Sequence, residues 1–306
     1  MIHPSPQVPT NERAPHELVD FRARPGWRSI KNAIATAMLG LAAVVVAVPL
    51  GLVAWSVAKQ GGHVAFASFP AFFTEEIPVV SRRVGPGMGP AILGTMLITG
   101  GATLIAVPLG VLGAVYLHEY GGASRFARVV RFMAMVMTGV PSVVMGLFVY
   151  ILWTIQFGFS AMGGSLALAC LMLPIVIGST EQMLRLVPGY LREAAYALGA
   201  TQSRVILSVV LPAAVPGIVS GVLLAIARAA GETAPLLFAV GAATSYNPNL
   251  FNGANTALSV QIFGNATSVF VGAQDRAWGA ALTLVLLTFL ASLAARLFTS
   301  RFAITR

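Results

Sequence analysis

Six long apolar runs constrain this chain more than any other feature of its sequence. An α-helix needs about 20 mostly apolar residues to cross the hydrocarbon core of a bilayer, and the runs reach or approach that length. They are Ala33–Ala58, Ala91–Leu117, Phe132–Ile155, Ala161–Gly178, Ala213–Val240 and Trp278–Phe298. Because lipid offers no hydrogen bonds to the backbone, each run is expected to be helical. The sequence therefore predicts an all-α integral membrane protein with six transmembrane helices.

The composition supports a membrane protein. Hydrophobic residues make up 57% of the 306 residues and charged residues only 9%, against roughly 25% charged residues in an ordinary soluble domain. So few charges cannot cover a surface that faces water on all sides. The net charge of +9 comes from residues spread between the apolar runs, and this spacing argues against a nucleic-acid-binding protein.

The arginines and lysines set the predicted orientation, because cytoplasmic loops are enriched in them. Fourteen of the 19 basic residues flank the runs on one side, four lie on the other side, and Arg228 lies within the fifth run. Both termini are therefore expected in the cytoplasm. The predicted segments are a tail (1–32), a first helix (33–58), an external loop (59–90), a five-helix core (91–298) and a C-terminus (299–306).

The sequence lacks the residue patterns of common catalytic sites. It contains no Walker A loop, no HExxH pair and no evident Ser, His and Asp set. The four histidines are scattered and Cys170 is the only cysteine, so neither a metal site nor an intrachain disulfide is expected. A transporter, a channel or a scaffold remains, with no catalytic site and no cofactor in this chain.

Arg228 and Glu232 are the charged pair that most directly points to a function. An arginine near the centre of a membrane helix costs roughly 2.5–3.5 kcal/mol, so it is expected to face protein or water. The two residues are four apart and can pair on one helix face, and a guanidinium can give a tetrahedral oxyanion two parallel hydrogen bonds. The pair is therefore a candidate substrate-pathway site, and a purely structural ion pair is the alternative.

The segment between the fourth and fifth runs, about 181–212, predicts a helix-turn-helix on the cytoplasmic face. Gly199 can end the first helix in a left-handed conformation, and Pro212 suits the first turn of the next span. Ala194 and Ala195 would let another backbone approach closely, as on a partner-binding helix. A solvated linker helix is the alternative. His118, Glu119, Tyr120 and Glu181 are expected to be membrane-interface residues.

The spacing of this segment resembles the EAA loop of ABC-importer permeases, the inner-membrane components of binding-protein-dependent transport. That pattern is Glu-Ala-Ala, three residues, Gly, nine residues, Ile, one residue and Leu-Pro. The matching residues are Glu193, Ala194, Ala195, Gly199, Val209, Leu211 and Pro212, with valine in place of isoleucine. The resemblance implies a type I ABC-importer permease fold, in which this loop is the coupling helix that sits in a groove of a separate ATPase.

Three further stretches are similar to the A-type permease subunit of the bacterial high-affinity phosphate (Pst) importer. They are Gly139–Leu147, Leu173–Ile177 and Arg228–Leu237. The similarity implies inward transport of inorganic phosphate across the bacterial cytoplasmic membrane. It also implies a heterodimer with a C-type permease, two copies of a phosphate-transport ATPase that bind ATP and Mg, and an external phosphate-binding protein.

Other functions stay open at this point. The chain could be a permease for another oxyanion. An ATP-independent anion transporter is a second possibility, although inverted repeats typical of that class are not evident. A non-transporting scaffold would leave Arg228 unexplained.

Overall fold

The computed structural model describes residues 27–79, 87–122 and 124–300, apart from the side chains of residues 295 and 298–300. Every secondary-structure element in these ranges is helical, with no strand among them. The predicted all-α class is therefore confirmed. Most of the predicted tail, part of the predicted external loop and residues 301–306 lie outside the described ranges.

The chain divides into two units, Met1–Val53 and Ala54–Arg306. The first unit contains most of helix α1 (Trp27–Ser56), which has Pro49 inside it and no buried residue. This helix begins six residues before the predicted start of the first span at Ala33. A helix that is apolar on all sides has no polar face to turn to water, which is typical of a membrane span.

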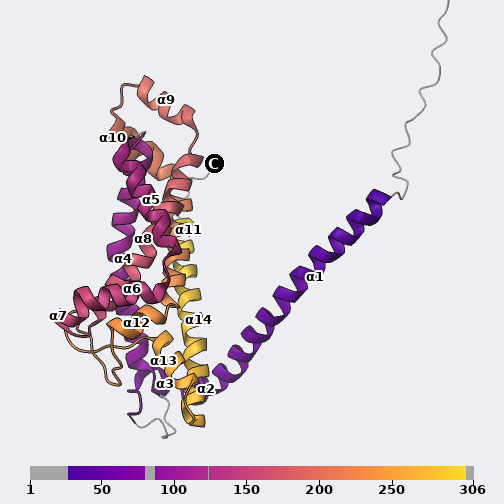
Figure 1. Cartoon of the computed structure of the whole chain (residues 1–306), viewed down its shortest axis with the longest axis vertical. Helices are drawn as coiled ribbons and strands as arrows, with labels where there is room; N and C mark the ends of the chain where they lie inside the picture. The colour runs from indigo at the N-terminus through magenta and orange to yellow at the C-terminus, as the bar shows by residue number, and fades with distance from the viewer. Residues whose placement is uncertain (1–26, 80–86, 123, 301–306) are drawn as a thin grey trace, which may run out of the picture. The chain divides into compact units, whose positions relative to one another are not determined.

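The second unit contains all the other helices, which Figure 1 labels along the chain. Short helices and π-helical turns (η) lie between the long ones. In chain order they are η1 (Val57–Gly61), α2 (Gly62–Ala67), α3 (Ala71–Thr74), α4 (Gly89–Val115), η2 (Tyr116–Tyr120), α5 (Arg125–Gly139), α6 (Ser142–Val149), η3 (Tyr150–Thr154), α7 (Ile155–Phe157), α8 (Ala161–Leu186), α9 (Gly189–Ala197), α10 (Gln202–Val205), η4 (Ile206–Val210), α11 (Leu211–Ala230), α12 (Ala234–Ala239), α13 (Leu258–Ala266) and α14 (Val271–Ser300).

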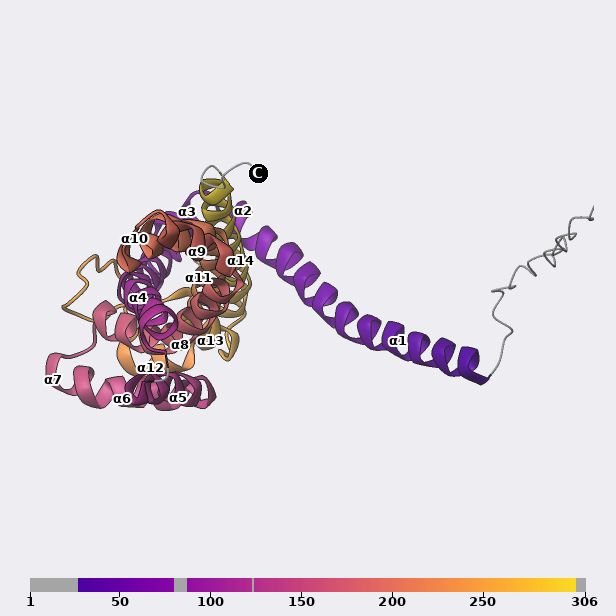
Figure 2. The same ribbon diagram turned by 90° about the horizontal axis from the view of Figure 1, so that it is seen from above.

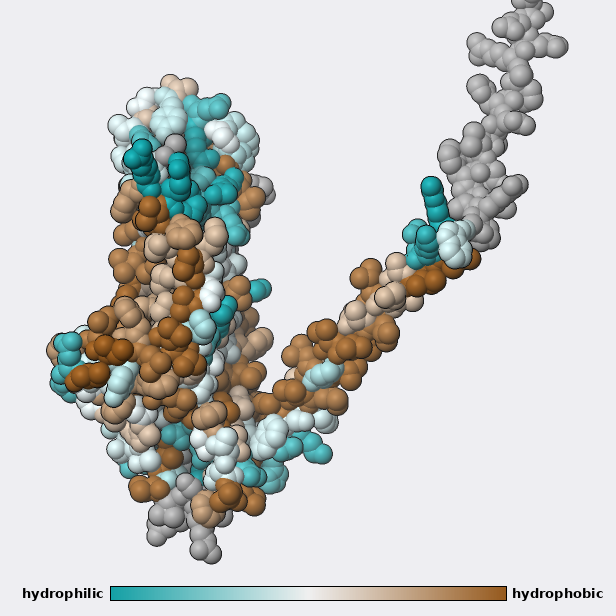
Figure 3. All heavy atoms as spheres, viewed as in Figure 1, coloured by the Kyte–Doolittle hydropathy of each residue, from teal (hydrophilic) through white to brown (hydrophobic). Residues whose placement is uncertain are grey.

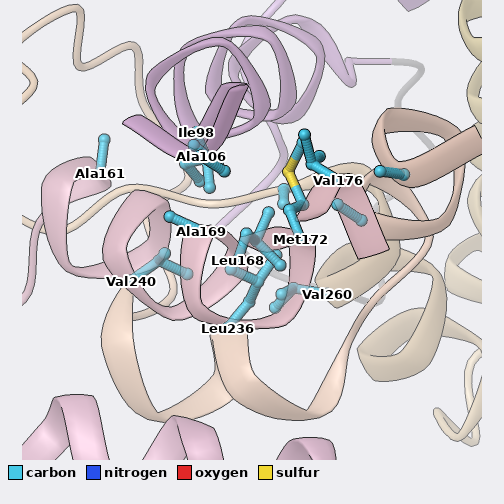
Figure 4. Packing of buried hydrophobic residues seen from close by; sticks show 14 residues of the cluster. Ile98, Ala106, Ala161, Leu168, Ala169, Met172, Val176, Leu236, Val240 and Val260 are labelled. Atoms are coloured by element: carbon cyan, nitrogen blue, oxygen red, sulfur yellow. The ribbon is translucent and has the colours of Figure 1, made fainter. Parts of the chain in front are cut away.

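Helix α8 is the centre of the second unit. It contacts α4, α11, α5, α6 and α12, and Figure 2 shows α4, α8, α11 and α14 side by side with α5 and α6 along one flank. Small residues let α4 and α8 approach closely: a Cβ atom at Gly110 would lie only 2.7 Å from Cγ1 of Val176. Figure 4 shows Ile98 and Ala106 of α4 above Leu168, Ala169 and Met172 of α8, in the largest apolar core cluster.

The surface of the second unit fits a membrane band. Figure 3 shows hydrophobic side chains over the middle of this body, and hydrophilic ones gathered at the end that carries α9 and α10. Five helices of the described residues are long and apolar enough to cross a membrane, and up to six if one bent helix pair is a single span. The prediction of a multi-span membrane protein is therefore confirmed.

The bent pair corrects the third predicted span, Phe132–Ile155. Helices α5 and α6 meet at an angle of 108°, because Val140 and Pro141 between them adopt extended backbone conformations, with ψ of 128° and 135°. Proline has no N–H to continue a helix and disfavours the helical conformation of the residue before it. The run is therefore a broken span or a re-entrant segment, not a straight helix.

Two more predicted segments differ from the structure. The loop predicted over 59–90 includes helix as far as Ala67 and again in α3, because Ala65 and Phe72 are buried in an apolar cluster with residues of α4, α13 and α14.

The predicted fifth span also begins at a different residue. Pro212 is the second residue of α11, but α10, η4 and α11 form one candidate span from Gln202 to Ala230. The fifth span thus begins ten residues before Pro212, and the π-turn η4 precedes the proline.

Candidate functional site

Arg228 and Glu232 line a cavity of about 240 Å³ in the second unit. Its other lining residues come from α5, α6, α8 and the bend between α5 and α6: Met137, Thr138, Val140, Pro141, Ser142, Leu171, Pro174 and Ile175. A water molecule occupies about 30 Å³, so the cavity has room for several waters or for a small anion. Among the lining residues, four have polar side chains: Arg228, Glu232, Thr138 and Ser142.

Two interruptions of helical backbone meet around this cavity. One is the Val140–Pro141 bend, and the other is the Gly231–Thr233 segment between α11 and α12. Non-helical backbone at membrane depth is tolerated where protein buries it or where it lines a cavity. Helix α6 holds the two interruptions together by packing on α12, and a Cβ atom at Gly146 would lie 2.6 Å from Cα of Pro235.

The close approach at Gly146 gives a packing prediction. Gly146→Ala should lower the amount of folded protein, because no Cβ fits against Pro235 and overpacking typically costs about 1–3 kcal/mol. Gly139→Ala is the matched control, since a Cβ at Gly139 meets nothing within 4 Å. The measurement is the yield and melting temperature of detergent-purified protein. Equal behaviour of the two variants would contradict the packing of α6 on α12.

The ion pair between Arg228 and Glu232 is loose. Nε of Arg228 lies 3.7 Å from Oε1 of Glu232, and the two side chains are 67% and 21% exposed in this chain. By contrast, Glu181 and Glu119 make ion pairs of 2.8–2.9 Å. A pair that served only packing inside a membrane protein would be enclosed and close, because an uncompensated charge there is costly. The open geometry favours a guanidinium that is available to an anion.

Thr138, Ser142 and Pro174 line the cavity but were not predicted from the sequence as site residues. Their signal was nevertheless present, since Ser142 and Pro174 belong to stretches that carry the resemblance to the phosphate-importer permeases. Those three stretches converge here: Pro141 and Ser142 come from the first, Pro174 and Ile175 from the second, and Arg228 and Glu232 from the third. Residues that lie far apart in sequence therefore form one polar cavity.

A second, larger cavity of about 880 Å³ lies between α4, α11 and α14. Its lining is apolar apart from threonine and serine hydroxyls, among them Thr95, Thr99 and Ser292, and it contains no charged residue. It therefore offers no counter-charge to an anion. Among the described residues, no three His, Cys, Asp or Glu side chains gather in a way that could hold a metal ion.

The segment that resembles the EAA loop forms helix α9, a turn and the start of the next span. Gly199 has φ of +76°, the left-handed conformation expected from the sequence. The N–H of Ala200 donates to the carbonyl of Ala195 at 3.2 Å, and the N–H of Gly199 donates to that of Tyr196 at 2.9 Å. This is the hydrogen-bond pattern of a Schellman cap, which satisfies the free carbonyls at a helix C-terminus.

The residues of this motif divide between the surface and the protein interior. Glu193, Ala194, Gly199 and Pro212 are exposed. Ala195 and Leu211 instead pack partly against an apolar cluster centred on Leu184, Val205 and Val210, and Val209 is half-buried. Ala194 is thus the more exposed of the two alanines, while Ala195 also packs α9 against its own chain.

Glu119 and Glu181, for which membrane-interface positions are predicted, both have partners within the chain. Glu181 is only 7% exposed, and its Oε1 accepts from Nε of Arg131 on α5 at 3.1 Å and from Nη2 of Arg185 on α8 at 2.8 Å. The Glu119 side chain is 8% exposed and pairs with Arg192 of α9. Partners 50 and 73 residues away in the chain neutralise these carboxylates inside the protein.

Comparison with known proteins places this arrangement in a family. Residues 106–304 match the family described as the binding-protein-dependent transport system inner membrane component. The phosphate transport system permease protein PstA 1 of Mycobacterium tuberculosis is 42% identical over 295 residues, which cover 95% of each chain. PstA of Haemophilus influenzae is 39% identical over 273 residues, which cover 89% of this chain and 95% of the relative.

Solved structures agree on the fold. An inward-facing structure of the MetNI methionine ABC transporter matches with a TM-score of 0.54 and 22% identity, over 70% of this chain and 92% of its own. A bacterial ABC transporter involved in the import of the acidic polysaccharide alginate matches with a TM-score of 0.58 and 16% identity, over 91% and 99%. At such identities these structures show the fold alone, which is that of an ABC-importer permease.

The family match and the curated relatives together cover both the cavity residues and the α9 loop. The chain therefore belongs to the inner membrane components of binding-protein-dependent transport systems and, among them, to the PstA permease proteins.

Proposed function

We propose that this chain is the permease subunit of an ATP-driven ABC importer that moves inorganic phosphate into the cell. The observation that carries the proposal is the match over 95% of both chains with a relative named as a phosphate transport system permease protein. The cavity supports it, because the motif stretches that resemble phosphate permeases surround an exposed arginine there. The chain itself performs no covalent chemistry.

Within the cavity, the guanidinium of Arg228 is the proposed phosphate contact. It can present two parallel N–H donors to the oxygens of a tetrahedral anion. Glu232 lies 3.7 Å away, so it orients the guanidinium and offsets part of its charge. This keeps the anion weakly bound, as a transport pathway requires for release. Thr138 and Ser142 are the other residues of the lining with polar side chains.

The proposed complex contains this chain and a C-type permease as a heterodimer, two copies of a phosphate-transport ATPase and an external phosphate-binding protein. Helix α9 is the coupling helix, whose exposed residues Glu193 and Ala194 face the ATPase. ATP and Mg bind to that ATPase, and its closure moves α9. The helices then alternate between outward and inward access to the cavity.

Uptake of labelled phosphate tests the proposed function. The chain and its complex partners are expressed in a bacterial strain that lacks its own phosphate importers, and uptake is followed with sulfate and molybdate as competitors. ATP-dependent uptake that excess unlabelled phosphate suppresses, and that sulfate and molybdate do not, is the expected result. Competition by sulfate or molybdate would indicate a permease for another oxyanion, and uptake without the ATPase would indicate a secondary transporter.

The proposed orientation has both termini in the cytoplasm. A reporter that is active only in the cytoplasm should be active when fused after Arg306 and silent when inserted near Asn252, because basic residues are concentrated on the side of the termini. The measurement is reporter activity normalised to the amount of membrane-inserted protein. The reverse pattern at either position would overturn this orientation.

A further inference from the structure

Glu119 joins the α9 loop to the end of α4. Nη2 of Arg192 lies 2.9 Å from Oε1 of Glu119, and the two side chains are only 19% and 8% exposed. The same guanidinium donates to the carbonyls of Leu184 at 3.0 Å and Val187 at 2.8 Å, at the end of α8. Nε2 of Gln202 donates to the backbone oxygen of Glu119 at 2.8 Å. Arg192, before the turn at Gly199, and Gln202, after it, thus both bind Glu119.

The π-turn η2, which contains Glu119, is also held from α5. Nη2 of Arg131 donates to the carbonyl of Leu117 at 3.1 Å, one of the carbonyls that a helix end leaves without an intrahelical donor. Arg131 also pairs with Glu181 of α8 at 2.9 Å. The end of α4 therefore contacts the α9 loop through Glu119 and contacts α5 through Leu117.

Helix α5 leads from these contacts to the candidate transport cavity. Arg131 and Thr138 are seven residues apart on this helix, which is about two turns, and Thr138 lines the cavity with Arg228. The helix ends at Gly139, directly before the Val140–Pro141 bend. A displacement of α9 can therefore reach the cavity through two side-chain joints and one continuous helix.

We propose that Glu119 and Arg192 form a joint between α9 and the end of α4, which the contact of Arg131 with Leu117 extends to α5, so that α9 and α5 move together and the motion of the coupling helix reaches the cavity. The proposal rests on the transport function proposed above. Both are positioning residues, since neither lines the cavity. Separating two buried, paired charges leaves each of them uncompensated, which is costly. The buried pair therefore keeps Glu119 and Arg192 together when α9 moves.

Coupling between sites requires direct evidence of coupling, and the ratio of phosphate moved to ATP hydrolysed measures it. The complete transporter is reconstituted in proteoliposomes with the binding protein and inorganic phosphate. Glu119→Gln and Arg192→Gln should each lower this ratio at least tenfold at equal amounts of assembled complex. The double variant should be no worse than either single variant, because both changes break the same joint.

Two further variants sharpen the test. Arg128→Gln is the matched control, because Arg128 is an exposed arginine on α5, and its ratio should stay within twofold of the unchanged protein. Arg192→Lys keeps the charge but loses the planar fork, so it should give an intermediate ratio and serves where a glutamine variant does not assemble. Loss of assembled complex in the joint variants with an unchanged ratio would overturn the proposal and leave a structural ion pair only.

A distance measurement tests the joint without reference to the transported anion. Spin labels are attached at Met135→Cys on α5 and Tyr196→Cys on α9, both exposed positions, after Cys170→Ala removes the native cysteine. The distance between the labels should stay constant when ATP is added to the unchanged joint, and should change in the Glu119→Gln variant. The proposal would be overturned if ATP changed the distance between the labels in the protein with Glu119 intact. It would also be overturned if the distance stayed constant both in that protein and in the Glu119→Gln variant. If the distances behave as expected but the complex does not take up phosphate, the proposed substrate is wrong while the proposed role of Glu119 and Arg192 is supported.

Discussion

Arg228→Gln is expected to abolish phosphate uptake, with a loss of at least tenfold, while the transporter still assembles. Hydrogen bonds to a charged group contribute about 1.5–3 kcal/mol, and glutamine retains a donor but loses both the charge and the forked geometry. Arg228 and Glu232 are 3.7 Å apart, with side chains that are 67% and 21% exposed, so the replacement removes only a loose contact. The measurement is labelled-phosphate uptake normalised to the amount of assembled complex.

Companion variants separate transport from packing. Arg228→Lys keeps the charge but not the two-pronged contact, so it should retain only part of the uptake. Glu232→Gln should be milder than Arg228→Gln, because Glu232 orients the guanidinium and does not itself attract an anion. The decisive protein is the double glutamine variant. If it regains both assembly and uptake, the pair is structural and Arg228 does not contact the anion.

Gly199→Asp should leave the chain inserted in the membrane but stop ATP-dependent uptake. Gly199 ends α9 with φ of +76°, and a Cβ atom there meets nothing within 4 Å. The expected loss therefore comes from a negative charge introduced on the exposed surface that is proposed to face the ATPase, not from a clash within the chain. Uptake and copurification of the ATPase are measured together.

Two further substitutions at this position separate charge from backbone conformation. Asparagine tolerates the left-handed conformation and is neutral, so Gly199→Asn should keep most of the uptake. Valine is β-branched and rarely adopts positive φ; it should disturb the turn, at a cost of about 1–2 kcal/mol, and weaken coupling. Normal uptake with normal ATPase copurification in Gly199→Asp would show that α9 is not the coupling helix.

The two sites lie on different elements, yet the described contacts connect them. Arg192 of α9 pairs with Glu119 at the end of α4. Arg131 of α5 donates to the carbonyl of Leu117 at that same end, and α5 continues from Arg131 to the cavity lining. If Gly199→Asp detaches the ATPase, uptake and ATP hydrolysis by the complex should fall together. If Glu119→Gln breaks the joint, ATP hydrolysis should continue while phosphate uptake falls. This difference separates a docking defect from a transmission defect.

The sequence by itself determined the features that depend on local chemistry. Apolar length predicted the membrane helices, because each lipid-embedded segment must satisfy its own backbone. The left-handed turn at Gly199 followed from the freedom that glycine has at positive φ. The spacing after Glu193 identified the importer family, and the charge of Arg228 within an apolar run marked it as a candidate functional residue.

Only the tertiary structure decided which distant residues meet. It brought the Val140–Pro141 bend against the Gly231–Thr233 break, and thereby placed Thr138 and Ser142 beside Arg228. It also paired Glu119 with Arg192 and Glu181 with Arg131, where the sequence predicted membrane-interface residues. The physical reason is that helix formation and turn geometry depend on neighbouring residues, whereas burial of a charge depends on how separate helices pack, and helix packing joins residues that no local spacing relates.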